Sequence, residues 1–377
     1  MSEKKKLILF ITSLPTDDEY ALQSLTTIVG SLQREYSVEV IKAWPDQQNQ
    51  RSLFVRGRIG LLWSTVKAAR RIANSDVHEV LVYQPTVSLL LISLFFLRNK
   101  QVVVDGSAAS FLAVPSLLFR NSLLRKLFCL PARIIVSSTQ QKQLARALFN
   151  LDASRVKVVS KGIPAAMFLR LNAVKYYQKP YGLTLTYSGT LDDPTRIWPL
   201  LHAAVRMPGV KLNLIGDGKL FPALRKYIRS NRLRSVSLYN ALNWKRKLPF
   251  YQISSALVVF PEKADESRPT DGLMEAASIG LPVVYMGIAA NQPLVRRLEH
   301  VITVSEFTEE SVTAGLRELP QGATERSAAN RRLIHQRYLS DRLYVTYRAA
   351  LVEVPEMSEL ELSSVSVTDL LDSALTA

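Results

Sequence analysis

Three glycine-containing turns in the second half of the chain are the residues best placed to do chemistry. Gly189 directly follows the apolar run LTLTYS, Gly216 and Gly218 follow the run VKLNLI, and Gly272 precedes a short amphipathic helix pattern. Glycine lets a ligand approach the backbone closely, and a helix start offers free N–H groups and a positive dipole end. Three such turns at one sheet edge predict a ligand that carries phosphate.

A carboxylate follows the last of these turns, in the segment ESRPTDGLMEAASIGLPVV. Glu275 lies one turn into the expected helix. One interpretation is a surface charge near a helix start, where the dipole is worth only about 0.3–1 kcal/mol. The other is a ligand for a molecule bound in front of the loop.

Alternating strand and helix patterns position these residues, as is typical of βαβ units on a parallel sheet. Strands are expected at 6–13, 37–42, 80–83, 101–105, 133–137 and 157–159, and again at 183–188, 211–216, 236–239, 256–260, 282–285 and 301–304. Helices are expected at 21–34, 59–73, 87–97, 140–148, 198–206, 221–231 and 273–278, with a long last helix at 325–351.

The two series of strands predict two domains, since 377 residues exceed one ordinary core. The fold class is α/β, with two tandem Rossmann-like, doubly wound domains that face a central cleft, where carboxyl ends of strands meet a ligand. The expected domains are 1–162 and 163–352, the second closed by the last helix. The acidic tail 353–377 is expected to be disordered or to form a short docking helix.

Composition narrows the classes of function. Four scattered histidines show no metal-ligand spacing, and a single cysteine excludes an internal disulfide framework, so neither a metal site nor an oxidising compartment is expected. No apolar run is long enough to span a membrane, and no signal-peptide pattern is visible. These features predict a cytoplasmic protein.

Charge is distributed unevenly. Residues 353–377 carry six acids and no Lys or Arg, so the preceding 352 residues hold a formal charge of +22 where the whole chain holds +16. A segment with this positive charge should attract phosphorylated substrates, anionic lipid surfaces or nucleic acid. The alternative is that this charge only keeps the protein soluble.

The motifs of the second half occur in an order and spacing that resemble a known family. They run from YSGTL at 187–191 through LIGDG at 214–218 and LPFY at 248–251 to EAASIGLPVV at 275–284. This series resembles the C-terminal half of GT-B fold glycosyltransferases, of the glycosyltransferase family 4 type. The segments RIIVSS at 133–138 and VVSKGI at 158–163 resemble that family more loosely.

The resemblance implies a nucleotide-sugar donor held mainly by the C-terminal domain and an acceptor held by the N-terminal domain. It also implies transfer with retention at the anomeric carbon, without an obligatory metal or cofactor. Glu275 matches a glutamate that hydrogen-bonds the ribose hydroxyls, and its two oxygens suit a vicinal diol. The positions implied to bind the donor are Gly189, Thr190, Gly216, Asp217, Gly218, Arg268, Thr270, Asp271, Gly272, Leu273 and Glu275.

One departure from the family concerns a second glutamate. The family has it eight positions before the first, facing the donor sugar and phosphate, but here that position is Ser267. Glu266 is one residue away, and a one-residue insertion in the following loop would restore its place. Glu266 is therefore the candidate catalytic carboxylate.

Another departure concerns the cations that a departing diphosphate needs. The family has an arginine after the first glycine, where this chain has Thr190, and a lysine where it has Thr195. Arg196, Arg268 and Lys161 are the candidate replacements, each equally well an ordinary surface charge. Arg196 is taken as the catalytic cation.

The first half offers fewer signals. The loop TSLPTDDEY at 12–20 lacks the glycine pair with which many family members approach the donor, and Asp17 and Asp18 would repel a diphosphate. Asp105 ends an expected strand where the family often has a histidine near the reacting sugar. We expect it to contact sugar or acceptor, although a turn-forming Asp-Gly pair is the alternative.

Two basic amphipathic segments, 56–71 and 117–128, suit either an anionic membrane surface or packing against the sheet. The first places Trp63 on an apolar face, with basic residues beside it. The apolar face comprises Ile59, Leu62, Trp63 and Val66, and the basic residues are Lys67, Arg70 and Arg71. If both segments are interfacial, the acceptor is lipid-linked and the protein is peripheral on the inner face of the membrane.

The leading hypothesis is a transferase that moves a sugar from a nucleotide donor to a glycan or lipid-linked acceptor in surface polysaccharide or glycoconjugate assembly. One alternative is a GT-B-fold subunit that has lost donor chemistry and serves an active transferase as a partner. Another is transfer to modified DNA bases, which the basic body suits. No aromatic-interleaved basic groove supports it, so a nucleic-acid partner is not expected.

Overall fold

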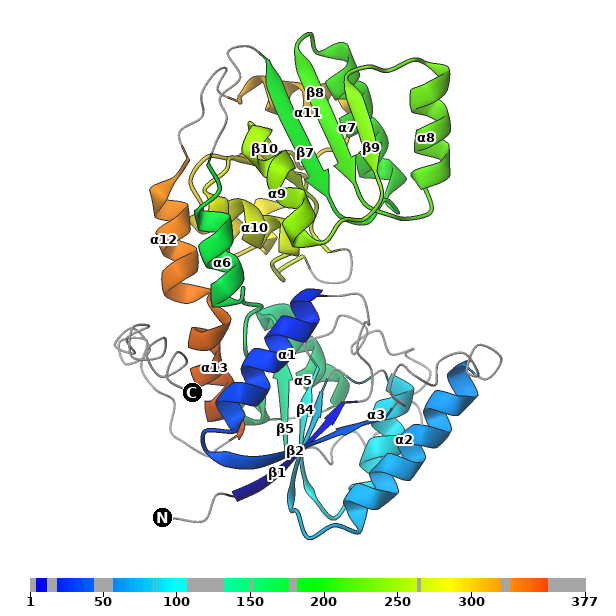
Figure 1. Cartoon of the computed structure of the whole chain (residues 1–377), viewed down its shortest axis with the longest axis vertical. Helices are drawn as coiled ribbons and strands as arrows, with labels where there is room; N and C mark the ends of the chain where they lie inside the picture. Colours follow the sequence, from blue (N-terminus) through cyan, green and yellow to red (C-terminus); the bar gives the residue numbers. More distant parts are fainter. Residues whose placement is uncertain are drawn as a thin grey trace. The chain divides into compact units, whose positions relative to one another are not determined.

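The computed structural model describes residues 5–11, 19–43, 57–83, 85, 87–106, 132–149, 152–175, 182–262, 266–319 and 326–351. The chain divides into two compact units, one of Met1–Pro164 with Ser340–Ala377 and the other of Ala165–Leu339. Each unit contains a parallel six-stranded sheet with helices packed against it (Figure 1). The predicted α/β class is therefore confirmed.

The sheet of the first unit has the order β2-β1-β3-β4-β5-β6, with all neighbours parallel. Because β2 and β3 lie on opposite sides of β1, the winding reverses there, as in doubly wound folds. Its strands are β1 (Lys5–Ile11), β2 (Tyr36–Lys42), β3 (Glu79–Tyr83), β4 (Gln101–Asp105), β5 (Arg133–Val136) and β6 (Val156–Val158). Its helices are α1 (Glu19–Leu32), α2 (Gly57–Ala73), α3 (Val87–Phe96), α5 (Thr139–Phe149) and α13 (Ser340–Leu351).

Both faces of this sheet are buried. Alternate strand residues such as Ile8 and Phe10 pack in one core with residues of α2, α3 and α5. The residues between them, such as Leu9, pack in a second core with residues of α1 and α13. Two buried faces explain the nearly continuous Val, Ile and Leu runs of the strands.

The sheet of the second unit has the order β12-β11-β10-β7-β8-β9, again parallel throughout. Its winding reverses between β7 and β10. Its strands are β7 (Leu183–Ser188), β8 (Val210–Ile215), β9 (Val236–Tyr239), β10 (Ala256–Val259), β11 (Val283–Tyr285) and β12 (Val301–Thr303). Its α-helices are α6 (Ala165–Asn172), α7 (Pro194–Arg206), α8 (Phe221–Ser230), α9 (Trp244–Ile253), α10 (Asp271–Ile279), α11 (Glu309–Arg317) and α12 (Ala328–Arg337).

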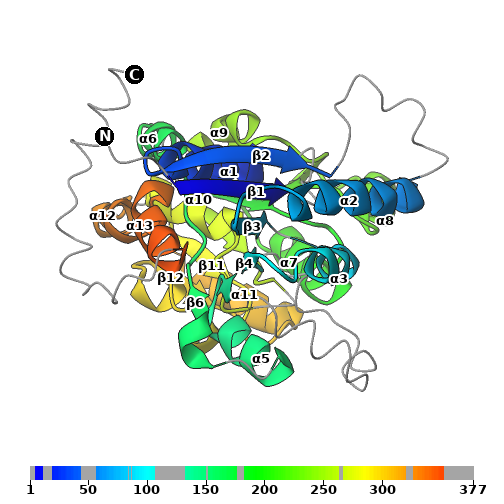
Figure 2. The ribbon, with the colours of Figure 1, turned by 90° about the horizontal axis from the view of Figure 1, so that it is seen from below.

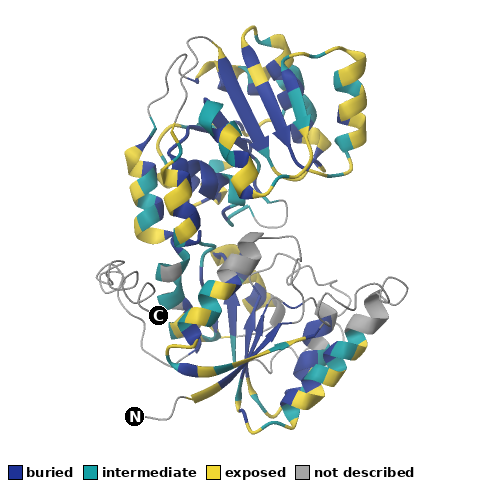
Figure 3. Cartoon of the chain, in the orientation of Figure 1, coloured by how far each residue is buried: buried dark blue, intermediate teal, exposed yellow. Residues whose placement is uncertain are grey.

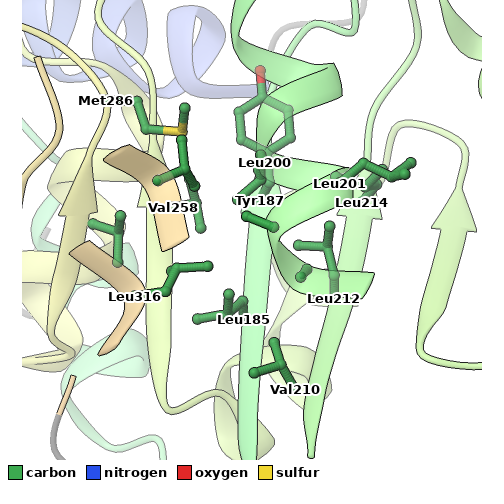
Figure 4. Packing of buried hydrophobic residues seen from close by; sticks show 14 of the residues in the cluster. Leu185, Tyr187, Leu200, Leu201, Val210, Leu212, Leu214, Val258, Met286 and Leu316 are labelled. Atoms are coloured by element: carbon green, nitrogen blue, oxygen red, sulfur yellow. The ribbon is translucent and has the colours of Figure 1, made fainter. Parts of the chain in front are cut away.

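One face of this second sheet carries a large apolar cluster. It includes Leu185 and Leu212 from the central strands together with Leu200 of α7 and Leu316 of α11 (Figure 4). The central strands of both sheets are buried, whereas most of the helices also present exposed residues (Figure 3). The packed helices therefore fix the position of the central strands and of the turns that follow them.

The predicted last helix, 325–351, is two helices in the structure. Helix α12 ends at Arg337, and the N–H of Ser340 then donates to the carbonyl of Ile163 (2.9 Å), not to the helix behind it. Helix α13 starts at that point and buries Tyr347 and Leu351 in the first unit. The structure therefore groups 340–351 with the first unit, although the prediction had the last helix close the second domain.

Candidate functional site

The predicted glycine turns lie together at the carboxyl edge of the second sheet. A side chain on Gly216 would collide with the carbonyl oxygen of Gly189. A Cβ atom on Gly272 would lie 3.5 Å from the carbonyl oxygen of Ser188. The turns after β7 and β8 thus pack backbone to backbone, with the start of α10 beside them. This edge is where the winding reverses, the usual ligand position in open α/β sheets.

Hydrogen bonds to backbone carbonyl groups fix the shape of the two turns. The N–H of Leu191 donates to the carbonyl of Asp217 (2.9 Å), and the Tyr187 hydroxyl donates to the carbonyl of Thr190 (2.7 Å). Gly218 has φ 153°, a conformation that favours glycine. The side chains of Thr190 and Asp217 are exposed at this edge.

Helix α10 begins at the same edge. Thr270 caps it, with its hydroxyl accepting from the N–H of Leu273 (3.4 Å), and Asp271 lies in the first turn. Leu273 itself is buried in the core. Since the first backbone N–H groups of a helix have no partner within the helix, they are available to an anion.

Glu275 is fully buried, which contradicts the interpretation as a surface charge. The Lys247 ammonium lies 2.7 Å from Oε1 and 2.8 Å from Oε2, and the Tyr251 hydroxyl also donates to Oε2. Burial, followed by the Glu275 carboxylate, raises the pKa of Tyr251 well above its ordinary value, so the phenol keeps its proton and donates. The sequence prediction did not include these two partners, which are one turn apart on α9.

The structure brings together two of the predicted catalytic residues, Arg196 and Glu266. Nη2 of Arg196 lies 3.7 Å from Oε1 of Glu266, and Nη1 donates to Oδ2 of Asp193 (3.2 Å). The guanidinium carbon lies 4.6 Å from the ring centroid of Phe307. Oε2 of Glu266 accepts from the side-chain amide of Asn291 (2.7 Å). Arg196 is thus a buried cation that contacts two carboxylates and one aromatic ring.

The other candidate cations are placed differently. Nη1 of Arg268 lies 3.3 Å from Oε2 of Glu262. Arg196, Lys247 and Arg268, the cations discussed at this edge, therefore each face a carboxylate among the described residues. Lys161 belongs to the first unit. The positive charge that these side chains could offer to a phosphate is thus already partly balanced by protein carboxylates.

Asp105 ends β4 in the first unit. It is 2% exposed, and Oδ2 accepts from the hydroxyl of Tyr347 on α13 (2.9 Å). Burial, with the Asp105 carboxylate next, raises the pKa of Tyr347 well above its ordinary value. The carboxylate is thus held by the protein itself, and its contact with a sugar or acceptor stays a prediction. Residues 12–18 of the loop before α1 lie outside the described residues.

Residues 57–71 of the basic segment form most of α2, which lies beside α3 in both views (Figures 1 and 2). Trp63 is 68% exposed and Phe95 of α3 is 53% exposed. Lys67 and Arg70 are exposed on α2, and the guanidinium of Arg70 lies 5.2 Å from the ring centroid of Phe96. The side chain of Ile59 and the segment 117–128 lie outside the described residues.

Among the described residues, no group of histidine, cysteine, aspartate and glutamate side chains could hold a metal ion. Within the same part of the chain, no helix is long and apolar enough to cross a membrane.

No family model and no curated protein matches the sequence. Solved structures do match. HepE from Anabaena in complex with UDP and glucose is 16% identical, with a TM-score of 0.63 over 92% of this chain and 99% of that one. The apo lipopolysaccharide outer core galactosyltransferase WaaB is 12% identical, with a TM-score of 0.61 and coverage of 92% and 99%. A glycosyltransferase from Rickettsia africae is 11% identical, with a TM-score of 0.65 and coverage of 97% and 100%. These similarities confirm the GT-B fold, whereas the family 4 type stays a prediction.

Proposed function

We propose that the protein is a glycosyltransferase that takes its sugar from a nucleotide-sugar donor bound at the carboxyl edge of the second sheet. The convergence of the three glycine turns with the start of α10 is the observation that carries the proposal. Similar structures have been solved with UDP and with UDP-glucose bound. A diphosphate fits the turns, where backbone N–H groups and the dipole of α10 favour negative charge.

The Arg196–Glu266 pair would act where the sugar leaves the diphosphate. In this proposal the bond from the anomeric carbon to the diphosphate oxygen breaks, and the acceptor oxygen bonds to the same face of the sugar. The acceptor proton passes to the departing phosphate oxygen. Arg196 and the α10 N–H groups stabilise the charge that develops, while Glu266 faces the sugar. Retention then needs no protein nucleophile, metal or cofactor.

The test of the reaction begins with thermal shifts of the full chain with UDP, GDP and ADP, which identify the nucleotide. A panel of the corresponding nucleotide sugars is then assayed for release of the nucleoside diphosphate and of the free sugar. Glu266→Gln is expected to lower kcat at least tenfold with little change in KM. Glu310→Gln, an exposed site on α11, is the matched control. Equal kcat in both variants would remove Glu266 from the mechanism.

A catalytically inactive partner subunit is the second candidate, because Arg196, Lys247 and Arg268 already face carboxylates. Failure of all three nucleotides to bind, together with recovery of a stable protein partner on purification, would favour it. A sugar epimerase is a further outcome of the assay, since a putative UDP-N-acetylglucosamine 2-epimerase shares the fold at a TM-score of 0.58. An epimerised sugar product would identify that reaction.

We also propose that the acceptor is a glycan or lipid-linked molecule and that α2 and α3 bind an anionic bilayer. Exposed aromatic residues among basic ones fit the headgroup region of such a surface. Flotation with vesicles of phosphatidylcholine, with and without phosphatidylglycerol, tests it. The double variant Trp63→Ser, Phe95→Ser should lose binding to the anionic vesicles. Leu169→Ser, at an apolar site on α6 of the second unit that is about as exposed as Phe95, should keep it. Equal binding by the two variants would overturn the assignment.

A further inference from the structure

The partners of Glu275 form a buried polar cluster beneath the glycine turns. Lys247 and Tyr251 both reach across from α9 to α10, and the Tyr251 hydroxyl also has a hydrogen bond with the side chain of Ser188. Ser188 is the last residue of β7 and immediately precedes Gly189. The cluster therefore connects two helices with the turn that is expected to hold phosphate.

Of the three side chains Lys247, Tyr251 and Glu275, only Lys247 retains some exposure to solvent. Glu275 and Tyr251 are fully buried, while the Lys247 side chain retains 10% exposure. A carboxylate offers about four acceptor positions. Lys247 contacts both of its oxygens, and Tyr251 takes a further position on Oε2. Because Glu275 and Tyr251 are fully buried, a ribose hydroxyl that approaches past the partly exposed Lys247 can reach the carboxylate only if the Lys247 side chain shifts.

We propose that Lys247 and Tyr251 are positioning residues that make Glu275 selective for a ribose diol. Tyr251 holds Oε2, and Lys247 releases Oε1 to a ribose hydroxyl while it keeps its contact with Oε2. The ammonium also offsets the negative charge of Glu275, which would otherwise repel the diphosphate of the same ligand. The inference rests on the proposed nucleotide site and adds to it the two residues that position Glu275.

The experiment compares dissociation constants for UDP and 2′-deoxy-UDP by calorimetry on the full chain. If the wild type prefers GDP or ADP, that nucleotide and its 2′-deoxy form are used instead. The wild type is expected to bind the ribonucleotide about 10- to 100-fold more tightly, as for a hydrogen bond to a charged group. In Tyr251→Phe and Lys247→Met the preference should fall to about threefold or less. Lys245→Met, on the same helix and exposed over the Trp244 ring, should retain it.

The ratio separates positioning from a merely structural role, since a general loss of stability weakens binding of both nucleotides equally. If Lys247→Met does not fold, Tyr251→Phe decides, because it removes one hydroxyl and leaves the ion pair in place. An unchanged preference in a folded Tyr251→Phe would overturn the inference and leave the proposed function standing. A wild type that binds none of the three nucleoside diphosphates would overturn both.

Discussion

At the scale of single residues, Gly216 stands where any side chain would strike the Gly189 carbonyl oxygen. Both contacting groups are backbone, so neither can rotate away, and the two turns must separate to admit a methyl group. Gly216→Ala is therefore expected to cost about 1–3 kcal/mol, as for overpacking. It should also abolish binding of the nucleotide that stabilises the wild type. Urea unfolding and calorimetric titration measure the two effects.

Gly30 in α1 is the matched control for this substitution. A Cβ atom there would meet nothing within 4 Å. Alanine in a helix is favoured over glycine by roughly 0.5–1 kcal/mol, so Gly30→Ala should stabilise the protein and leave nucleotide binding intact. A Gly216→Ala variant as stable as Gly30→Ala would contradict the packing described for the turns.

These residues also show how far sequence reasoning reaches. The glycine turns could be predicted because glycine after an apolar run has a local backbone meaning, and parallel strands bring such turns to one edge. The pairing of Glu275 with Lys247 and Tyr251 could not. Those partners are 28 and 24 residues away, and the contact depends on how α9 packs against α10.

At the scale of elements, α13 is tied to β4 by the hydrogen bond from Tyr347 to Asp105. Tyr347→Phe would leave a buried carboxylate without this donor and should cost about 1–3 kcal/mol. Tyr344→Phe, one turn earlier, is the control, because that hydroxyl has no hydrogen-bond partner in the described part of the chain. It should change stability by about 0.5 kcal/mol or less near neutral pH. Equal effects in urea unfolding would contradict the assignment of the bond.

Tyr344 of the same helix should lower the stability of the protein at alkaline pH. Burial, followed by the charge of Glu35, raises the pKa of Tyr344 to about 12 from an ordinary value of 10.0. The protonated phenol contributes fully to the free energy of unfolding below pH 10. Between pH 10 and 12 the unfolded chain loses this proton while the folded chain keeps it, so the free energy of unfolding declines. The decline is up to about 1.4 kcal/mol per pH unit. Urea midpoints at increasing pH should therefore fall less steeply for Tyr344→Phe than for the wild type, and parallel curves would refute this.

Elements were predictable to different degrees for physical reasons. The central strands are buried on both faces, so their runs of Val, Ile and Leu predict them to within two residues at each end. Helix α9 was not among the predicted helices, and it contains Pro249, a residue that normally interrupts a helix. The long helix predicted at 325–351 has continuous apolar spacing, but spacing does not show that Ser340 bonds Ile163 and that the chain changes units there.

At the scale of the whole molecule, the return of the chain to its first unit makes the stability of that unit depend on its C-terminal segment. Tyr347 and Leu351 are buried in the same core as Leu25 and Leu32 of α1. A chain that ends at Leu339 would expose that core and remove the donor to Asp105. Burying a side chain of this size contributes about 1.5–3 kcal/mol, so the loss should be a large part of the stability of a domain.

Native-state hydrogen exchange can assign this loss to one unit. In the chain that ends at Leu339, amides of β4 and β5 should exchange at least tenfold faster, whereas those of β7 and β8 should be unchanged. A chain that ends at Leu351 keeps α13 and so separates the effect of the helix from that of the acidic tail. Faster exchange in β7 instead would mean that α13 stabilises the second unit, as the sequence prediction had it. Because a domain near its threshold unfolds with the loss of a few kcal/mol, the first unit of the shorter chain should also be cleaved first in limited proteolysis.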